Sequence, residues 1–151
     1  MSKENLEYAG FWIRVGAGLI DTVMLMLIVA PVMYAVYGED YFYSDQTVLG
    51  LADVLMNWIF PFVATVLFWL SGGATPGKMA TKLKVVDERT GNNISTKQAI
   101  IRYIGYFISA FCFLLGLIWV AIHSKKRGWH DMLAGTVVIR TRGKEPVVFE
   151  Q

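Results

Sequence analysis

Two long apolar stretches dominate the pattern of hydrophobic and polar positions. The first, residues 12–37, contains few polar residues, among them Arg14 and Asp21. The second, residues 51–71, is interrupted by isolated polar residues and by Pro61. A helix needs about 20 predominantly apolar residues to cross a bilayer. Each stretch therefore predicts a transmembrane helix, with a kink at Pro61 that a membrane helix can tolerate.

A third apolar segment covers about residues 102–122 and is also long enough to cross once. If it crosses, the basic residues on its two sides face opposite sides of the membrane. If it turns back near Leu115 and Gly116 as two half-helices, both basic groups share one side, as the positive-inside rule requires. Both forms remain open at this point, and we favour the re-entrant one.

The loop at residues 72–101 is polar, basic and rich in glycine, so we expect it outside the hydrocarbon. Thr75 followed by Pro76 predicts the N-cap and first residue of a short helix. Ser95 with Gln98 three residues later predicts a capping box for the helix that enters the third apolar segment.

The sequence LKVVD at residues 83–87 has the composition of a strand. Its partner is either a return strand that starts at Ile94 or the sequence TVVIRTR (136–142) in the tail, residues 123–151, if both lie on one side. We therefore predict an all-α membrane protein with one domain, residues 1–151. It has two transmembrane helices, a third apolar segment that is re-entrant or spanning, and a small cytoplasmic β-hairpin or sheet at the membrane surface.

Composition and charge agree with this fold. The chain is 55% hydrophobic and 17% charged, which is too apolar for an ordinary soluble domain. All Lys and Arg residues except Lys3 and Arg14 lie in residues 78–102 or 125–144, whereas the connection 38–50 carries only acidic charges. By the positive-inside rule we expect a multi-pass protein of the cell membrane with both termini in the cytoplasm.

Several classes of function have no support in the sequence. One cysteine, Cys112, and two histidines without ligand spacing predict no metal and no cofactor. The sequence GGATPGK lacks phosphate-loop spacing, because Met79 follows the lysine. Basic segments beside a bilayer are explained by orientation and anionic lipid, so we expect no nucleic-acid partner. No nucleophile and base arrangement is evident, and we expect no enzyme.

Asp21 is the strongest candidate for a functional residue, because an ionisable group inside a membrane helix is costly. Arg14 lies two helical turns earlier on the same face, about 10 Å away, so the two share a stripe without touching through backbone geometry alone. The same depth, counted from the basic side, is reached by Thr65 and Ser109 in the other apolar segments. A polar layer is therefore predicted.

The role of Asp21 has three interpretations. It is a structural carboxylate, neutral by desolvation or paired with a base such as Arg102 or Lys78, that holds three helices in register. Alternatively it binds a transported ion or proton, or it docks a partner. The residues alone leave all three open.

The tail sequence KKRGWHDML places His130 beside Asp131. One hypothesis is that His130, next to this carboxylate, titrates near neutral pH and takes part in acid and base chemistry. The simpler interpretation, which we favour, is that Asp131 caps a short helix that ends at Gly135.

Arg14, Asp21 and Asp131 together resemble the pattern of the RDD family of membrane proteins. GFWIRVGAGLID resembles the family's opening motif, ATPGKMATKLKVVDERTG resembles its T-P-G-K motif with a following strand, and RGWHDMLAGTVVI resembles its closing H-D-x-x-A-G-T motif. The resemblance covers about residues 8–142. It implies the membrane topology and these three site residues, and transport is the activity suggested for the family.

Two hypotheses of function follow. The first is a transporter of monovalent cations or protons, in which Asp21 binds the ion and Arg14 competes with it or neutralises it. Three apolar segments are few for enclosing a path, so we expect a homo-oligomer, and glycine-containing helix faces favour assembly. The second is a membrane scaffold or accessory subunit that docks a partner protein through its cytoplasmic face.

Overall fold

The first membrane helix is continuous. In the computed structural model, which describes residues 6–112 and 114–140, α1 (Phe11–Tyr37) has 27 residues and passes through Pro31. The second membrane helix covers 22 residues, Leu51–Gly72. Both are long and apolar enough to cross a bilayer, which confirms the two predicted transmembrane helices.

The second membrane helix is irregular before its proline. It consists of α3 (Leu51–Val54), the π-helical turn η2 (Leu55–Ile59) and α4 (Phe60–Gly72). Pro61 has no N–H, so it cannot bond to the carbonyl of Asn57 as a helical residue would. The wider turn directly before Pro61 accommodates this missing bond.

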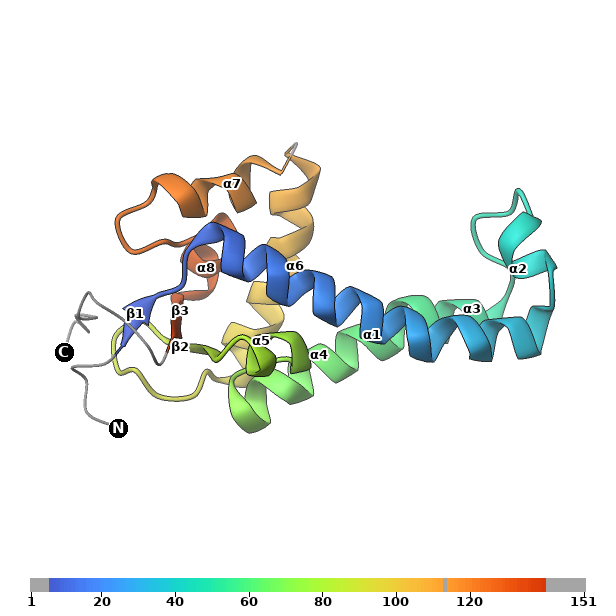
Figure 1. The fold of residues 1–151 in the computed structure, drawn as a ribbon, viewed down its shortest axis with the longest axis horizontal. Helices are drawn as coiled ribbons and strands as arrows, with labels where there is room; N and C mark the ends of the chain where they lie inside the picture. The colour runs from blue at the N-terminus through green and yellow to red at the C-terminus, as the bar shows by residue number, and fades with distance from the viewer. Residues whose placement is uncertain (1–5, 113, 141–151) are drawn as a thin grey trace.

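The two membrane helices extend together from a more compact part of the molecule (Figure 1). The short helix α2 (Asp40–Tyr43) lies in the connection between them, at the far end. Most apolar side chains of α1 are exposed, and Leu19 and Leu27 have 62% and 71% of their surface free. An apolar surface of this extent requires a bilayer or another protein to cover it.

The third apolar segment is bent. It forms α6 (Thr96–Phe111) and α7 (Leu115–Ile122), whose axes meet at 100°. The predicted capping box starts α6, since the Ser95 amide donates to Gln98 Oε1 at 2.9 Å and the Gln98 amide donates to Ser95 Oγ at 3.3 Å. The segment is therefore not one straight helix.

A three-stranded antiparallel sheet joins distant parts of the chain. Its order is β1 (Glu7–Tyr8), β3 (Thr136–Arg140), β2 (Leu83–Asp87). The pairing of LKVVD with the tail is therefore confirmed, although residues 141 and 142 of the predicted strand lie outside the described residues. A return strand at Ile94 is wrong, because Ile94 packs into the core instead.

This sheet brings three chain segments to one end of the molecule. β2 precedes the third apolar segment and β3 follows it, so their pairing places both ends of that segment side by side. β1 precedes the first membrane helix and pairs with β3. All three strands lie at the end away from α2 (Figure 1). The geometry supports a third segment that returns to the side on which it began.

Both faces of the sheet are buried, which explains its run of apolar residues. One face packs against the ends of the membrane helices, and its main contributors are Ala17, Trp69, Val85, Ala99 and Val138. The other face forms a smaller cluster of Leu6, Val86, Val137 and Ile139. Two short helices lie beside this core: α5 (Pro76–Ala80), which follows Thr75 as predicted, and α8 (Trp129–Ala134).

Candidate functional site

Asp131 joins three helices through one buried carboxylate. Its Oδ2 atom accepts hydrogen bonds from the Gly128 amide at 3.0 Å and from Arg14 Nη1 at 2.5 Å. Its Oδ1 atom binds the guanidinium of Arg102. The side chains of Asp131 and Arg102 are fully buried and that of Arg14 is 11% exposed. The carboxylate therefore connects α1, α6 and α8 where water has little access.

The two arginines have further partners. Arg14 donates through Nε to the Ala9 carbonyl at 3.0 Å and through Nη2 to the Lys126 carbonyl. Arg102 donates to Thr136 Oγ1 at 2.7 Å. Its guanidinium also lies over the rings of Trp69 and Tyr106, 5.2 and 5.6 Å from their centroids. These contacts offset part of the cost of burying both cations.

Asp131 stays ionised. Burial alone would raise the pKa of its carboxyl, but the attraction of Arg102 and Arg14 outweighs burial and holds this pKa far below its ordinary value. Asp131 also accepts a capping bond as predicted, but it lies in the first turn of α8 and Gly128 is the N-cap. The helix ends at Gly135, which adopts the left-handed conformation with φ 64°.

His130 is neutral. Burial lowers its pKa from 6.5 to about 3, because desolvation of the imidazolium and the nearby cations outweigh the attraction of Asp131. The ring stacks on Tyr106 with centroids 4.0 Å apart. The lowered pKa of His130 disfavours the alternative that this histidine titrates near neutral pH, and it agrees with the interpretation that we favour. The sequence shows the adjacent carboxylate and does not show the burial.

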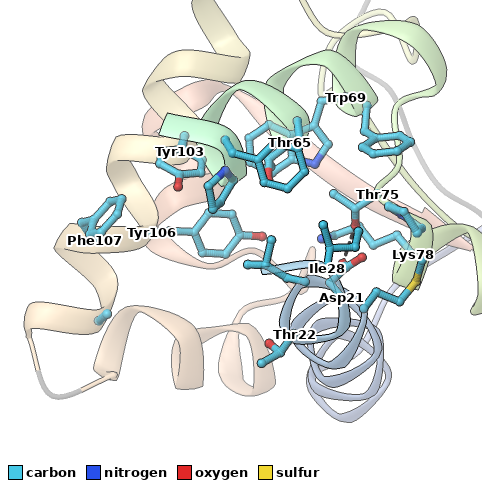
Figure 2. A pocket seen from close by; sticks show the side chains of 18 of the residues that line it. Asp21, Thr22, Ile28, Thr65, Trp69, Thr75, Lys78, Tyr103, Tyr106 and Phe107 are labelled. Carbon is cyan, nitrogen blue, oxygen red and sulfur yellow. Dashed lines mark hydrogen bonds between the residues drawn. The ribbon is translucent and has the colours of Figure 1, made fainter. Parts of the chain in front are cut away.

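Asp21 lies in a second polar cluster, at the edge of a cavity of about 550 Å³ between α1, α4 and α6 (Figure 2). Its Oδ2 atom accepts from the Thr75 hydroxyl at 2.6 Å, and its Oδ1 atom accepts from the Gly77 amide at 2.7 Å. The Thr75 hydroxyl therefore donates to a residue of α1 and does not cap α5. Asp21 therefore fastens the start of α5 to α1.

Asp21 pairs with none of the predicted bases. Arg14 and Arg102 both bind Asp131 instead, and no ion pair joins Asp21 to Lys78 in the part of the chain that the structure describes. The reason for Arg14 is directional, because helical side chains lean toward the helix N-terminus. Arg14 therefore points away from Asp21 and toward α8.

The predicted polar layer is only partly present. Thr65 of α4 lines the same cavity as Asp21 (Figure 2). Ser109 does not line it. Its buried hydroxyl lies against Gly116 of α7 and has no hydrogen-bond partner among the described residues. Counting residues along a straight helix misplaces Ser109, because the third segment bends back on itself after α6.

Lys78 is buried without an ion pair. It is 8% exposed, and the described residues provide no ion-pair partner for its ammonium group. Lys78 lines the cavity of Asp21 and also a second cavity of about 480 Å³ between α1 and α7. Tyr106 and Leu117 line both cavities as well. These three residues therefore separate the two spaces.

Tyr106 is a site residue that the sequence interpretation missed. It is stacked between Trp69, at 6.1 Å, and His130, and its hydroxyl accepts from Arg102 at 3.3 Å. The available signal was its position four residues after Arg102, which places both on one helix face. Among the described residues, no group of three His, Cys, Asp or Glu side chains is arranged to hold a metal ion.

Comparisons with known proteins identify a family and several relatives. The model of the RDD family matches residues 8–135. Uncharacterized protein YckC of Bacillus subtilis (strain 168) is 30% identical over 91% of this chain and 88% of its own length. Uncharacterized membrane protein YteJ of the same organism is 29% identical over 89% of this chain and 82% of its own length.

The similarity to a further relative is partial. Uncharacterized protein RP437 of Rickettsia prowazekii (strain Madrid E) is 38% identical over 50% of this chain, and the match spans 42% of that relative's length. This chain thus matches less than half of RP437. No solved structure is significantly similar to this chain.

Proposed function

Since this chain belongs to the RDD family and is an integral membrane protein, we propose that it transports protons or monovalent cations through a site at Asp21. The observation that carries the proposal is the position of the Asp21 carboxylate. It lies in a membrane-spanning helix, lines a cavity of about 550 Å³ and has no ion pair among the described residues. Ionisable groups in such positions are characteristic of ion and proton paths.

Neutral hydrogen-bond donors leave this carboxylate able to bind a cation. A carboxylate offers about four lone-pair positions, and the Thr75 hydroxyl and Gly77 amide take up two hydrogen bonds. Thr22 and Thr65 line the same cavity and supply further oxygen atoms. Oxygen is the ligand that hard cations prefer. A proton requires only the carboxylate itself.

We assign the competing cation to Lys78 rather than to Arg14. Arg14 is held by Asp131 and by two carbonyl groups, so it is not available to Asp21. Lys78 lines the cavity and directly follows Gly77, whose amide binds Asp21. An ammonium group that approaches Asp21 would favour release of a bound ion by competing for the carboxylate.

A transport path also requires further walls. The cavity is bounded by α1, α4 and α6, and the apolar surface of α1 is largely exposed. We propose that copies of this chain assemble in the cell membrane through such surfaces. We assign the sheet end to the cytoplasm, because the basic segments that flank the second and third apolar segments lie there.

The test is ion flux in liposomes. Purified protein is reconstituted with a pH-sensitive dye inside, and a gradient of a monovalent cation is applied. We expect wild-type protein to move protons in response to the gradient and Asp21→Asn to abolish this flux. Asparagine keeps the size of the side chain and one carbonyl acceptor, so the tether to α5 is largely retained.

A matched control separates this site from other membrane carboxylates. Asp53 is 5% exposed in α3, accepts hydrogen bonds from Leu49 and Asn57, and does not line the cavity. The Asp53→Asn variant should show the same proton flux as the wild-type protein. Flux that survives Asp21→Asn in folded protein contradicts the proposal. Absence of flux in wild type, with a stoichiometric co-purifying partner, would instead favour the scaffold function.

A further inference from the structure

The second cavity forms a groove between α1 and α7 that does not include Asp21. We call it the α1–α7 groove. Its walls are mainly apolar, with Phe11 and Val15 on one side and Leu117 and Ile118 on the other. Val15 and Ile118 are 36% and 45% exposed. The groove is therefore open and continuous with the apolar surface that the helices present to the membrane.

The polar lining of this groove contains a cation without an ion-pair partner among the described residues. Lys78 is more than nine-tenths buried, and its ammonium has no ion-pair partner among the described residues. Arg14 also lines the groove but is already bound by Asp131. The Nδ1 atom of His130, another lining residue, is buried without a hydrogen-bond partner in the described part of the chain.

The charges around the groove do not balance. Arg14, Arg102 and Lys78 carry three positive charges, and the first two share the single carboxylate of Asp131. Asp21, at the other cavity, supplies the second negative charge. One positive charge therefore has no carboxylate partner among these residues, and an unpaired charge with little access to water is unfavourable. An anion from outside the chain would complete this site.

We infer that the α1–α7 groove binds an anionic phospholipid, with the headgroup phosphate on Lys78 and an acyl chain along the walls formed by α1 and α7. The apolar walls favour a lipid over a water-soluble anion. The groove also lies near the sheet end, which the basic residues assign to the cytoplasmic leaflet, where anionic lipids are abundant. Basic pockets between membrane helices on that side bind such headgroups.

The experiment measures lipid retention by native mass spectrometry of the full-length protein in neutral detergent. The probes are phosphatidylglycerol and phosphatidylcholine with identical acyl chains. We expect wild type to prefer phosphatidylglycerol. Lys78→Gln should weaken its binding about tenfold, the effect of losing one charge-assisted hydrogen bond, whereas Lys78→Arg should retain binding. Lys97→Gln removes an exposed charge on α6 and should match wild type.

A second variant tests the apolar walls without changing charge. Gly18 lines the groove, and a Cβ atom at this position has no heavy atom within 4 Å. The side chain of Gly18→Leu therefore begins in open space, extends into the path of the acyl chain and should weaken retention of phosphatidylglycerol. Asp21→Asn removes a negative charge from this balance and should retain or strengthen binding of phosphatidylglycerol while ion flux is lost, so lipid binding and ion transport can fail separately.

Three results would overturn the inference. One is equal retention of the two lipids by wild type. Another is unchanged retention of phosphatidylglycerol by folded Lys78→Gln or, if that variant cannot be purified, by Gly18→Leu. The third is displacement of phosphatidylglycerol by an equal concentration of inorganic phosphate, which would identify a site for a soluble anion.

Discussion

Asp131 is the residue on which the burial of two arginines depends. Arg102 is fully buried and Arg14 nearly so, and Asp131 is the carboxylate that both contact. Removing one member of a buried charge group leaves the others without compensation, and this costs more than the net gain from forming the group. The energetic role of Asp131 is thus to permit the two guanidinium groups to remain inside.

We expect Asp131→Asn to lower the free energy of unfolding by about 3–5 kcal/mol, because two buried cations lose their counter-ion. The measurement is chemical unfolding in detergent micelles. Glu7→Gln is the control, since it removes the partner of Arg140 in a pair whose two side chains are 25% and 39% exposed. Its cost should be about 1 kcal/mol or less. Equal losses in the two variants would contradict this role of Asp131.

His130 gives the stability of the protein a dependence on pH. Its pKa is about 3 in the folded protein and 6.5 when unperturbed. Below pH 6.5 the unfolded chain takes up a proton that the folded protein does not, so stability falls as the pH decreases toward 3. The lowered pKa of Asp131 adds a further loss of stability only near and below the ordinary value of 3.8, so it overlaps with the effect of His130 at the acidic end of this window.

The expected slope from His130 is about 1.4 kcal/mol per pH unit between about pH 6 and about pH 4. His130→Phe should remove this slope and retain the stacking on Tyr106. His123→Gln, which changes the other histidine, should leave it in place. Unfolding measured across this pH range decides between these outcomes, and a slope that persists in His130→Phe would assign the dependence to other groups. The charged groups that face His130 are Asp131, Arg102, Arg14 and Lys78.

The individual site residues were readable from the sequence, but their partners were not. Arg14 and Asp21 stand out because a charge in an apolar segment is costly, and Asp131 stands out as a helix-cap candidate and through the family resemblance. Which of them pair depends on contacts between residues far apart in the chain. Arg14 and Asp131 are 117 residues apart, and no local spacing predicts their contact.

At the scale of elements, α5 shows how closely a short helix can pack against a membrane helix. Gly77 lies where α5 meets α1, and a Cβ atom there would collide with the Ala17 carbonyl oxygen. Its amide also donates to Asp21. The sequence predicts α5 from Thr75 and Pro76, because helix starts have local signals. It does not predict that the hydroxyl of Thr75 binds another helix.

Gly77→Ala should therefore separate α5 from α1 and lower the free energy of unfolding by about 1–3 kcal/mol, the usual cost of overpacking. Gly16→Ala is a matched control in α1, since a Cβ atom at Gly16 has no heavy atom within 4 Å. It should be neutral or stabilising, because alanine favours helix. A loss of stability in Gly16→Ala equal to that in Gly77→Ala would exclude close packing at Gly77 as the cause.

For the whole molecule, the sheet favours the re-entrant form of the third apolar segment, which the hydrophobic pattern leaves open. The length of the third apolar segment is equally compatible with crossing and with returning. The pairing of β2 with β3 places both ends of this segment side by side. The sequence contained the two strand patterns, but pairing between strands so far apart follows from tertiary structure. The membrane side of the sheet rests on the positive-inside rule alone.

This topology predicts a pattern of cysteine labelling in intact cells. In a Cys112→Ala background, single cysteines replace three exposed residues: Asp45 between the membrane helices, Thr90 before the third apolar segment and Ser124 after it. An impermeant thiol reagent added outside should label only Asp45→Cys, because we assign the segments at the sheet to the cytoplasm by the positive-inside rule. All three cysteines should react after permeabilisation. Labelling of Ser124→Cys but not Thr90→Cys in intact cells would mean that the segment crosses, and then β2 and β3 could not pair within one chain.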